Sequence, residues 1–303
     1  MTITGSEYCY EEFRDDFFVD VSRKKIWAVQ LDLLSELLRV CNKYDIKLFA
    51  QGGTLLGAIR HKGFIPWDDD LDVGILRDDY ERLCSVADKE FKYPYFFQNA
   101  LSDRRYFTGS ARLRNSETTG KINWHNSSDY NSGIFIDIFP YDGYCENNFK
   151  KFIQFKKRDI YGKILGIYYQ KEQSPNRLKK LLVPFIRKIV SIVPFEVYYK
   201  AYVKCCKKYN KTAELYCEVT NSFYSEQTKF YLSDILELTT HPFEMIRIPV
   251  PVNYDRVLRM QFQNYMEFPP VEQRGKHHEG QIIFEPDIPY KKYFEIMESR
   301  GEK

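Results

Sequence analysis

Four aspartates lie within five consecutive positions in the first quarter of this chain, and no other feature limits its fold as strongly. Asp68, Asp69, Asp70 and Asp72 directly follow the apolar residues 64–67. Carboxylates held this close repel one another, so we expect a cation beside them. Asp68 and Asp69 either serve a second metal ion or only shape the loop.

Residues 70–73 alternate between aspartate and an apolar residue, which is typical of a strand. Asp70 and Asp72 then share one face of the strand, while Leu71 and Val73 point to the core. Magnesium is usually held by one or two carboxylates together with water and substrate phosphates. The pattern therefore predicts Mg²⁺, with Mn²⁺ as the alternative cofactor, and a phosphate-bearing substrate. The competing interpretation is an acidic surface turn.

A glycine pair precedes the aspartates and follows a short apolar run. Glycines let the backbone approach a phosphate closely, and a threonine after them can cap a short helix over residues 55–60 whose first N–H groups face the same anion. A Gly-Gly pair followed by Asp-x-Asp indicates a nucleotidyltransferase-type site. We expect phosphate contacts from this loop and two basic residues after it: Gly52, Gly53, Thr54, Arg60 and Lys62.

A further acid interrupts the otherwise apolar run at residues 134–139. Burying a carboxylate in such a strand is unfavourable unless the carboxylate binds a cation. We therefore expect Asp137 to join the two strand aspartates as the third catalytic and metal-binding acid. The alternative is that Asp137 forms an ion pair with Arg112 or Arg114.

Those two arginines alternate with apolar residues near the end of a strand predicted over residues 107–115. Arg112 and Arg114 then share one face. A planar guanidinium suits phosphate, so we expect them to bind substrate or to neutralise the acids. The alternative is that both lie on a solvated face.

The stretch from Gly52 to Asp72 resembles the LicD family of phosphotransferases, relatives of fukutin and fukutin-related protein within the nucleotidyltransferase superfamily. Residues 133–140 and 265–278 match the family as well, so the resemblance covers about residues 48–278 with a weaker middle. It implies transfer of a phosphorylated alcohol, most often phosphocholine, from a CDP-alcohol donor to a hydroxyl of a glycan or its lipid-linked precursor. Lipopolysaccharide, teichoic acid and capsule are the expected acceptor classes.

The resemblance suggests in-line attack of an acceptor hydroxyl on the β-phosphorus of the donor, with CMP leaving. Asp70 and Asp72 would hold the metal ion, and Asp137 would bind metal or take the acceptor proton. Two other functions compete with this one. The same acids can move NMP from NTP to a small molecule or protein, or the chain can be an inactive glycan-binding scaffold.

The last matching stretch adds three candidate substrate contacts, Arg274, His277 and His278. Adjacent histidines lack the spacing of a helical metal pair, so we expect phosphate or glycan contacts from them, with unspecialised surface residues as the alternative.

A site for phosphocholine should enclose the quaternary ammonium in aromatic faces, because this group offers no hydrogen bond. Trp67 adjoins the acidic cluster, Trp124 lies between the arginine strand and Asp137, and Tyr141 follows that acid closely. The alternative is ordinary packing in the core.

The order of elements predicts an α+β fold with a nucleotidyltransferase-like mixed sheet. A helix capped by Ser22 is expected over residues 22–44, followed by strands at 47–51 and 71–76 and a helix at 78–89. We divide the chain into a catalytic core at residues 1–149, a basic helical insertion at 150–212, and a C-terminal part at 213–303 that completes the catalytic domain.

The insertion is strongly basic, with 17 Lys or Arg against three acids over residues 150–211. Residues 178–195 mix apolar and basic side chains and are expected to form short amphipathic helices broken at Pro184 and Pro194. Such helices lie on anionic membranes. The alternative is a helical subdomain that packs on the core and leaves its lysines solvated.

Other features exclude several protein classes. No apolar run is long enough to span a bilayer, and residues 1–20 are acidic and aromatic, unlike a signal peptide. We therefore expect a cytoplasmic protein, with the insertion as a peripheral contact to the inner face of the membrane.

No nucleic-acid module accompanies the basic region, so nucleic acid is not an expected partner. Seven cysteines without a Cys-x-x-Cys pair predict reduced thiols.

Overall fold

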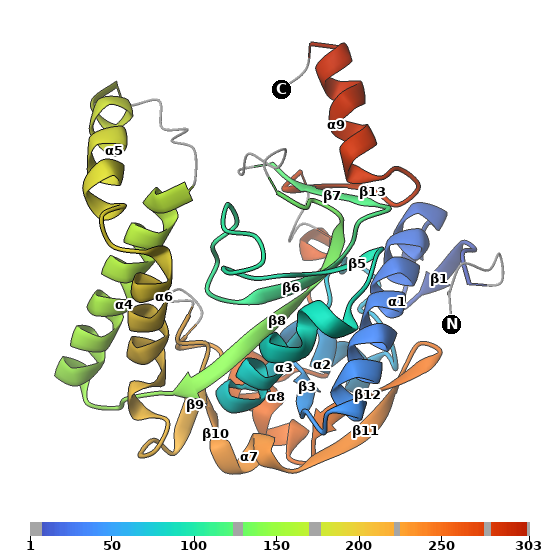
Figure 1. The fold of residues 1–303 in the computed structure, drawn as a ribbon. Helices are drawn as coiled ribbons and strands as arrows, with labels where there is room; N and C mark the ends of the chain where they lie inside the picture. Colours follow the sequence, from blue (N-terminus) through green and yellow to red (C-terminus); the bar gives the residue numbers. More distant parts are fainter. Residues whose placement is uncertain (1–7, 124–129, 170–176, 221–224, 276–279, 302–303) are drawn as a thin grey trace.

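The protein has an α+β fold, which confirms the predicted class (Figure 1). The computed structural model describes residues 8–123, 130–169, 177–220, 225–275 and 280–301. A mixed sheet lies at the centre, helices cover it, and a lobe of three helices projects to one side. All seven cysteines are free thiols.

The central sheet has seven strands, and strand β8 is its axis because β4, β6 and β9 all pair with it. Only the β4–β8 pair is parallel among the pairs of this sheet in the described residues. The strands are β3 (Leu48–Ala50), β4 (Asp72–Leu76), β5 (Tyr95–Gln98), β6 (Ala111–Asn115), β8 (Ile134–Gly143), β9 (Leu215–Cys217) and β10 (Phe230–Tyr231).

Three antiparallel pairs of strands lie around this sheet. They are β1 (Glu12–Arg14) with β2 (Phe17–Val19), β11 (Leu238–Phe243) with β12 (Ile246–Pro251), and β7 (Thr119–Ile122) with β13 (Ile282–Glu285).

Helix α1 (Val21–Lys43) buries a long apolar stripe, including Leu31 and Leu34, against the sheet. Asp20 rather than Ser22 caps it, because the Asp20 carboxylate accepts a hydrogen bond from the Arg23 N–H at 2.7 Å. The other helices of this part are α2 (Gly52–Arg60), α3 (Arg77–Glu90), α7 (Leu232–Leu236), α8 (Tyr254–Phe262) and α9 (Tyr290–Ser299), with 3₁₀ turns η2 (Lys207–Tyr209) and η3 (Val271–Gln273).

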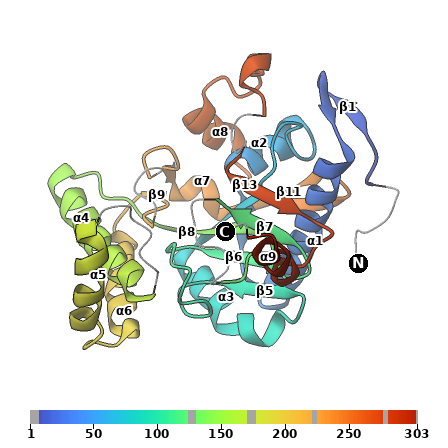
Figure 2. The same cartoon turned by 90° about the horizontal axis from the view of Figure 1, so that it is seen from above.

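The projecting lobe consists of α4 (Asn148–Tyr169), α5 (Arg177–Val190) and α6 (Phe195–Cys206). Figures 1 and 2 both show it beside the sheet at the end of β8. Its helices pack around a second apolar cluster that includes Leu165 and Phe195. The predicted break at Pro184 is wrong, since α5 continues through this proline. The second half of α5 is held on α4 by the Arg187 Nε–H, which donates to the Ile167 carbonyl at 2.8 Å.

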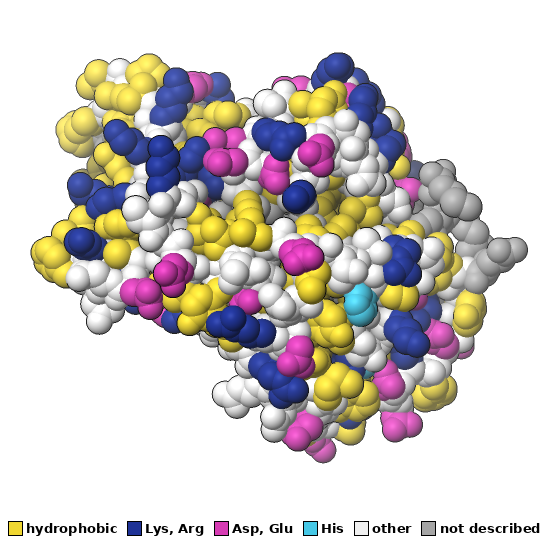
Figure 3. Space-filling model, turned by 90° about the horizontal axis from the view of Figure 1, so that it is seen from below, with side chains coloured by type: hydrophobic (Ala, Val, Ile, Leu, Met, Phe, Trp, Pro, Cys, Tyr) yellow, Lys and Arg dark blue, Asp and Glu magenta, His cyan; other side chains and the backbone are white. Residues whose placement is uncertain are grey.

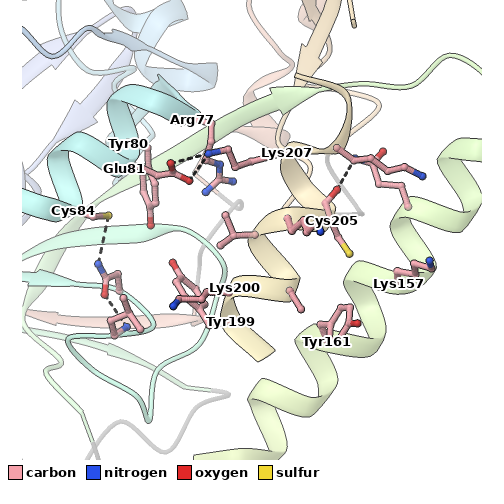
Figure 4. Close-up of a pocket in the computed structure, with 17 residues that line it drawn as sticks. Arg77, Tyr80, Glu81, Cys84, Lys157, Tyr161, Tyr199, Lys200, Cys205 and Lys207 are labelled. Carbon is pink, nitrogen blue, oxygen red and sulfur yellow. Dashed lines mark hydrogen bonds and ion pairs between the residues drawn. The ribbon is translucent and has the colours of Figure 1, made fainter. Parts of the chain in front are cut away.

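A cavity of about 970 Å³ separates this lobe from α3 (Figure 4). Lysines of α4 and α6 and three tyrosines line it. Glu81, the one carboxylate among its lining residues, forms an ion pair with Lys207 at 2.8 Å. The floor includes Arg77, whose Nε donates to both oxygens of Asp142, at 3.0 and 3.1 Å. Asn210 donates a further hydrogen bond to the same carboxylate at 3.0 Å.

Removal of the Asp142 carboxylate is expected to destabilise the fold. Arg77 and Asp142 are both buried, and Asp142→Ala leaves an uncompensated guanidinium between β8 and α3. We expect a loss of about 3–5 kcal/mol in the free energy of unfolding, measured by urea denaturation. The control is Arg259→Ala, which breaks an exposed ion pair with Asp255 and should cost about 1 kcal/mol or less. Equal losses in the two variants would contradict this assignment.

Candidate active site

The predicted acids meet because β4 and β8 are parallel neighbours. Asp72 at the start of β4 lies directly opposite Asp137 in β8. Side chains at paired positions of neighbouring strands point to the same face of a sheet, so these two carboxylates share one site. Asp70 lies two residues before β4 and is only partly exposed. The structure therefore brings together Asp70, Asp72 and Asp137.

Burial and mutual repulsion make this site electrostatically unfavourable for its own carboxylates. Burial, followed by the negative charges of Asp68 and Asp72, raises the pKa of Asp70 well above its usual range. The pKa of Asp72 is raised by burial and then by Asp137 and Glu218. Groups of this kind are stabilised by a cation.

Glu218 is a site residue that the sequence analysis missed. It follows β9 directly and is buried, and its carboxylate accepts a hydrogen bond from the Gln51 side chain. Burial and the charge of Asp137 raise the pKa of Glu218 to about 8, against the lowering effect of the Gln51 hydrogen bond. The available signal was an acid at the end of the apolar strand 215–217, the same kind of signal that marked Asp137.

Helix α1 fixes the backbone of the acidic loop. Arg23 and the Trp27 indole each donate a hydrogen bond to the Asp68 carbonyl at 3.0 Å. The Gln30 side chain donates to the Asp69 carbonyl at 2.8 Å. The backbone of both residues therefore shapes the loop, as one of the two interpretations held.

The glycine loop packs against the same aspartates. A Cβ atom on Gly53 would lie 2.7 Å from a carboxylate oxygen of Asp68, and Gly52 has a φ of +54°, so side chains are disfavoured at both positions. Thr54 does not cap a helix, because α2 begins two residues earlier. Its hydroxyl instead accepts the N–H of Asp72 at 2.8 Å and so fixes the start of β4.

Asp137 forms the ion pair that its sequence position left open, and its catalytic and metal-binding role stays a prediction. It faces Asp72, and it also pairs with Arg112, whose Nε lies 2.6 Å from the carboxylate. The Arg112 guanidinium is further held over the Phe135 ring, 3.8 Å from its centroid. Arg112 therefore neutralises part of the acidic charge.

Arg114 is buried, so the interpretation of it as a solvated residue was wrong. It is fully buried and donates to the Gln98 side chain at 2.5 Å and to the Gly133 carbonyl at 2.6 Å. Burial, followed by the nearby Arg112, lowers its pKa to about 10. Its Nε and Nη1 donors are used within the core, and the side chain is buried away from solvent.

Arg60 also differs from the prediction of a phosphate contact. Its Nη1 donates to the carbonyls of Tyr265 and Glu267 at 2.7 and 3.1 Å, so it ties α2 to the C-terminal part of the chain. Burial lowers the pKa of this guanidinium. Lys62 lies exposed in the loop after α2.

An aromatic cluster joins the two ends of the predicted motif region. The Trp67 ring packs edge-on against His61 and Phe268, with centroids 5.9 and 6.0 Å apart. The Arg274 guanidinium lies 4.7 Å from the Trp67 centroid and 5.5 Å from that of Phe268. Trp67 is half-buried, so its faces accept a cation next to the acidic loop.

The remaining candidates lie elsewhere. Tyr141 is fully buried and packs on Phe49 and Phe230, so the structure places it in the core rather than against substrate. Trp124, His277 and His278 fall outside the described residues.

The donor set fits a hard divalent cation. In the part of the chain that the structure describes, no group of three or more His, Cys, Asp or Glu side chains is placed to hold a metal ion. Magnesium is commonly held by one or two carboxylates, with water and substrate phosphates as its remaining ligands, so a pair of aspartates suffices for it. The site can thus hold a cation with a phosphorylated ligand and accept a proton.

Comparisons with known proteins agree with this chemistry. Residues 45–176 match the family model for the LicD/FKTN/FKRP nucleotidyltransferase domain. The lipopolysaccharide cholinephosphotransferase LicD of Haemophilus influenzae is 30% identical over 274 residues, which cover 82% of this chain and 93% of that protein. An uncharacterized protein of Rickettsia typhi is 29% identical over 145 residues, 47% of this chain and 44% of its own length.

Substitution of Glu218 is expected to change how stability depends on pH. An acid with a raised pKa stays protonated in the folded state where the unfolded chain has already lost its proton, so stability falls as pH rises from the ordinary pKa of a glutamate towards about 8. Glu218→Gln removes this dependence. We expect the variant to match the wild type at pH 5 and to melt at a higher temperature at pH 9, in buffer with EDTA.

The matched control is Glu226→Gln. The half-exposed Glu226 carboxylate accepts hydrogen bonds from Lys151 and from the Tyr144 hydroxyl. These contacts lower the pKa of Glu226 to about 2, although burial opposes this shift. That substitution should lower the melting temperature at both pH values. A Glu218→Gln variant that melts below the wild type at pH 9 would contradict the raised pKa.

Proposed function

Because this chain belongs to the LicD/FKTN/FKRP nucleotidyltransferase-domain family, we propose that it transfers phosphocholine from CDP-choline to a hydroxyl of a cell-surface glycan or its lipid-linked precursor. The observation that carries the proposal is the set of acids at the β4–β8 pair, where Asp72 faces Asp137. The name of the Haemophilus relative supports phosphocholine as the transferred group, and a lipopolysaccharide-type glycan as the acceptor.

The cofactor we propose is Mg²⁺ or Mn²⁺, held by Asp70, Asp72 and Asp137. When bound, such an ion supplies positive charge to the donor diphosphate and to the CMP that leaves. Asp70 and Asp72 suit this role, since burial and the neighbouring carboxylates raise the pKa of both acids, and a bound cation favours their charged forms.

In the proposed reaction, a bond forms between the acceptor oxygen and the β-phosphorus, while the bond from this phosphorus to the oxygen of CMP breaks. The acceptor proton passes to a carboxylate. We propose Glu218 for this step, because a base works best with a pKa near the operating pH and that of Glu218 is about 8. Asp137 is held by its ion pair with Arg112.

The aromatic cluster is the site we propose for the choline group. Trp67 adjoins the acidic loop in sequence, and its ring already lies against the guanidinium of Arg274. A quaternary ammonium carries the same charge and would take the place of this side chain. Such contacts supply about 2 kcal/mol when the cation is desolvated.

The first test concerns the acids. Asp72→Asn should lower the rate of CMP release from CDP-choline roughly a thousandfold, because several kcal/mol of transition-state stabilisation are lost. The fold should persist and melt at a higher temperature in EDTA, since one repelling charge is removed. The matched control is Asp78→Asn, at a side chain that is 92% exposed on α3. Retained turnover in Asp72→Asn would refute the site, and consumption of NTP instead of CDP-choline would favour NMP transfer.

The second test concerns the transferred group. Trp67→Leu should raise the KM for CDP-choline about tenfold or more, while changing that for CDP-glycerol little, because glycerol carries no charge for the ring to attract. Initial rates with the two donors at fixed acceptor measure this difference. An equal effect on both donors would show that Trp67 only supports the loop.

A further inference from the structure

Helix α5 turns an apolar stripe towards solvent. Leu182, Phe185, Ile186 and Ile189 are 53%, 64%, 38% and 54% exposed. Their spacing of three, four and seven residues places them on one face of the helix. We call these four residues the outer stripe of α5.

The outer stripe is not the face by which α5 packs in the lobe. Val183 and Val190 are each only 9% exposed and lie on the adjacent side of the helix, together with Arg187, which donates a hydrogen bond to α4. In Figures 1 and 2, α5 lies at the outer margin of the lobe, away from the sheet. The stripe is therefore additional to what folding of the lobe requires, and a large exposed apolar patch usually marks a binding surface.

A basic side chain adjoins the stripe. Lys188 is exposed and lies between Ile186 and Ile189 in the sequence, and Ile192, which is 79% exposed, follows the end of the helix. Figure 3 shows hydrophobic side chains interleaved with lysine and arginine over the lobe on its left side. Over residues 150–211 the chain carries 17 basic residues against three acids.

We propose that the outer stripe of α5 docks on an anionic lipid membrane. A helix with aliphatic and phenyl side chains on one face and lysines beside them lies in the plane of a bilayer, where the apolar groups enter the acyl boundary and the cations meet anionic headgroups. A second copy of the chain is a poorer occupant, because a two-fold contact through this face would set the lysines of one copy against those of the other.

Co-flotation with lipid vesicles tests the proposal without substrate, so its outcome is separate from that of the transferase assay. The wild type should float with vesicles of phosphatidylcholine and phosphatidylglycerol, and weakly with phosphatidylcholine alone. Phe185→Asp/Ile189→Asp should lower the bound fraction about tenfold or more. Lys188→Glu should lower it less, and the difference should shrink at high salt.

The matched control is Phe13→Asp/Met245→Asp, which replaces two apolar residues that are 77% and 52% exposed outside the lobe. It should float like the wild type. Failure of the wild type to float, equal flotation of the α5 variant, or equal binding to neutral vesicles would each overturn the proposal. Light scattering that shows a dimer, lost in the α5 variant, would assign the stripe to a second copy instead.

Discussion

Repulsion among carboxylates at the β4–β8 pair is the constraint on which the rest of the site depends. The parallel register sets Asp72 against Asp137, and neither strand can shift without moving the buried residues next to them. The surrounding structure offsets part of this repulsion: Arg112 pairs with one acid and Gln51 bonds Glu218. The pKa values of Asp70 and Asp72 remain raised, by burial first and then by the neighbouring acids, so these contacts do not remove the repulsion.

Supporting contacts come from parts of the chain far from the acids. Helix α1 holds the backbone of the acidic loop through three side chains, and Arg60 fastens α2 to the carbonyls of Tyr265 and Glu267. The stretches before and after the helical lobe therefore form one site, although about 200 residues separate Arg60 from Tyr265. Phe268 and Arg274 then pack on Trp67, which extends the site from the acids to an aromatic surface.

The sequence predicts which acids lie together in the fold. It predicts the contacts of the basic and aromatic side chains poorly. Asp72 and Asp137 could be identified because a carboxylate in a buried strand is rare, and that rule is local. Glu218 is also a buried carboxylate next to a strand. That strand has only three residues, so its alternation of side chains is too short to be recognised readily in the sequence. Arginine and tyrosine are residue types expected at substrate contacts, which is why the sequence analysis selected Arg114, Arg60 and Tyr141. Their real partners are carbonyls and rings from distant segments, and no local pattern encodes these.

Strand β8 links the chemistry to the lobe. Asp137 and Asp142 are an odd number of residues apart, so they point to opposite faces of the sheet, roughly 17 Å apart along the strand at 3.3–3.4 Å per residue. One face carries the acids, and the other holds Arg77 at the base of α3. Since α4 follows this strand after a short connection, a lobe that rests on a membrane would hold the acids at a restricted height above the lipid surface. A lipid-linked acceptor presents its hydroxyl within such a layer, so the lobe would restrict the search for acceptor to the surface where it lies.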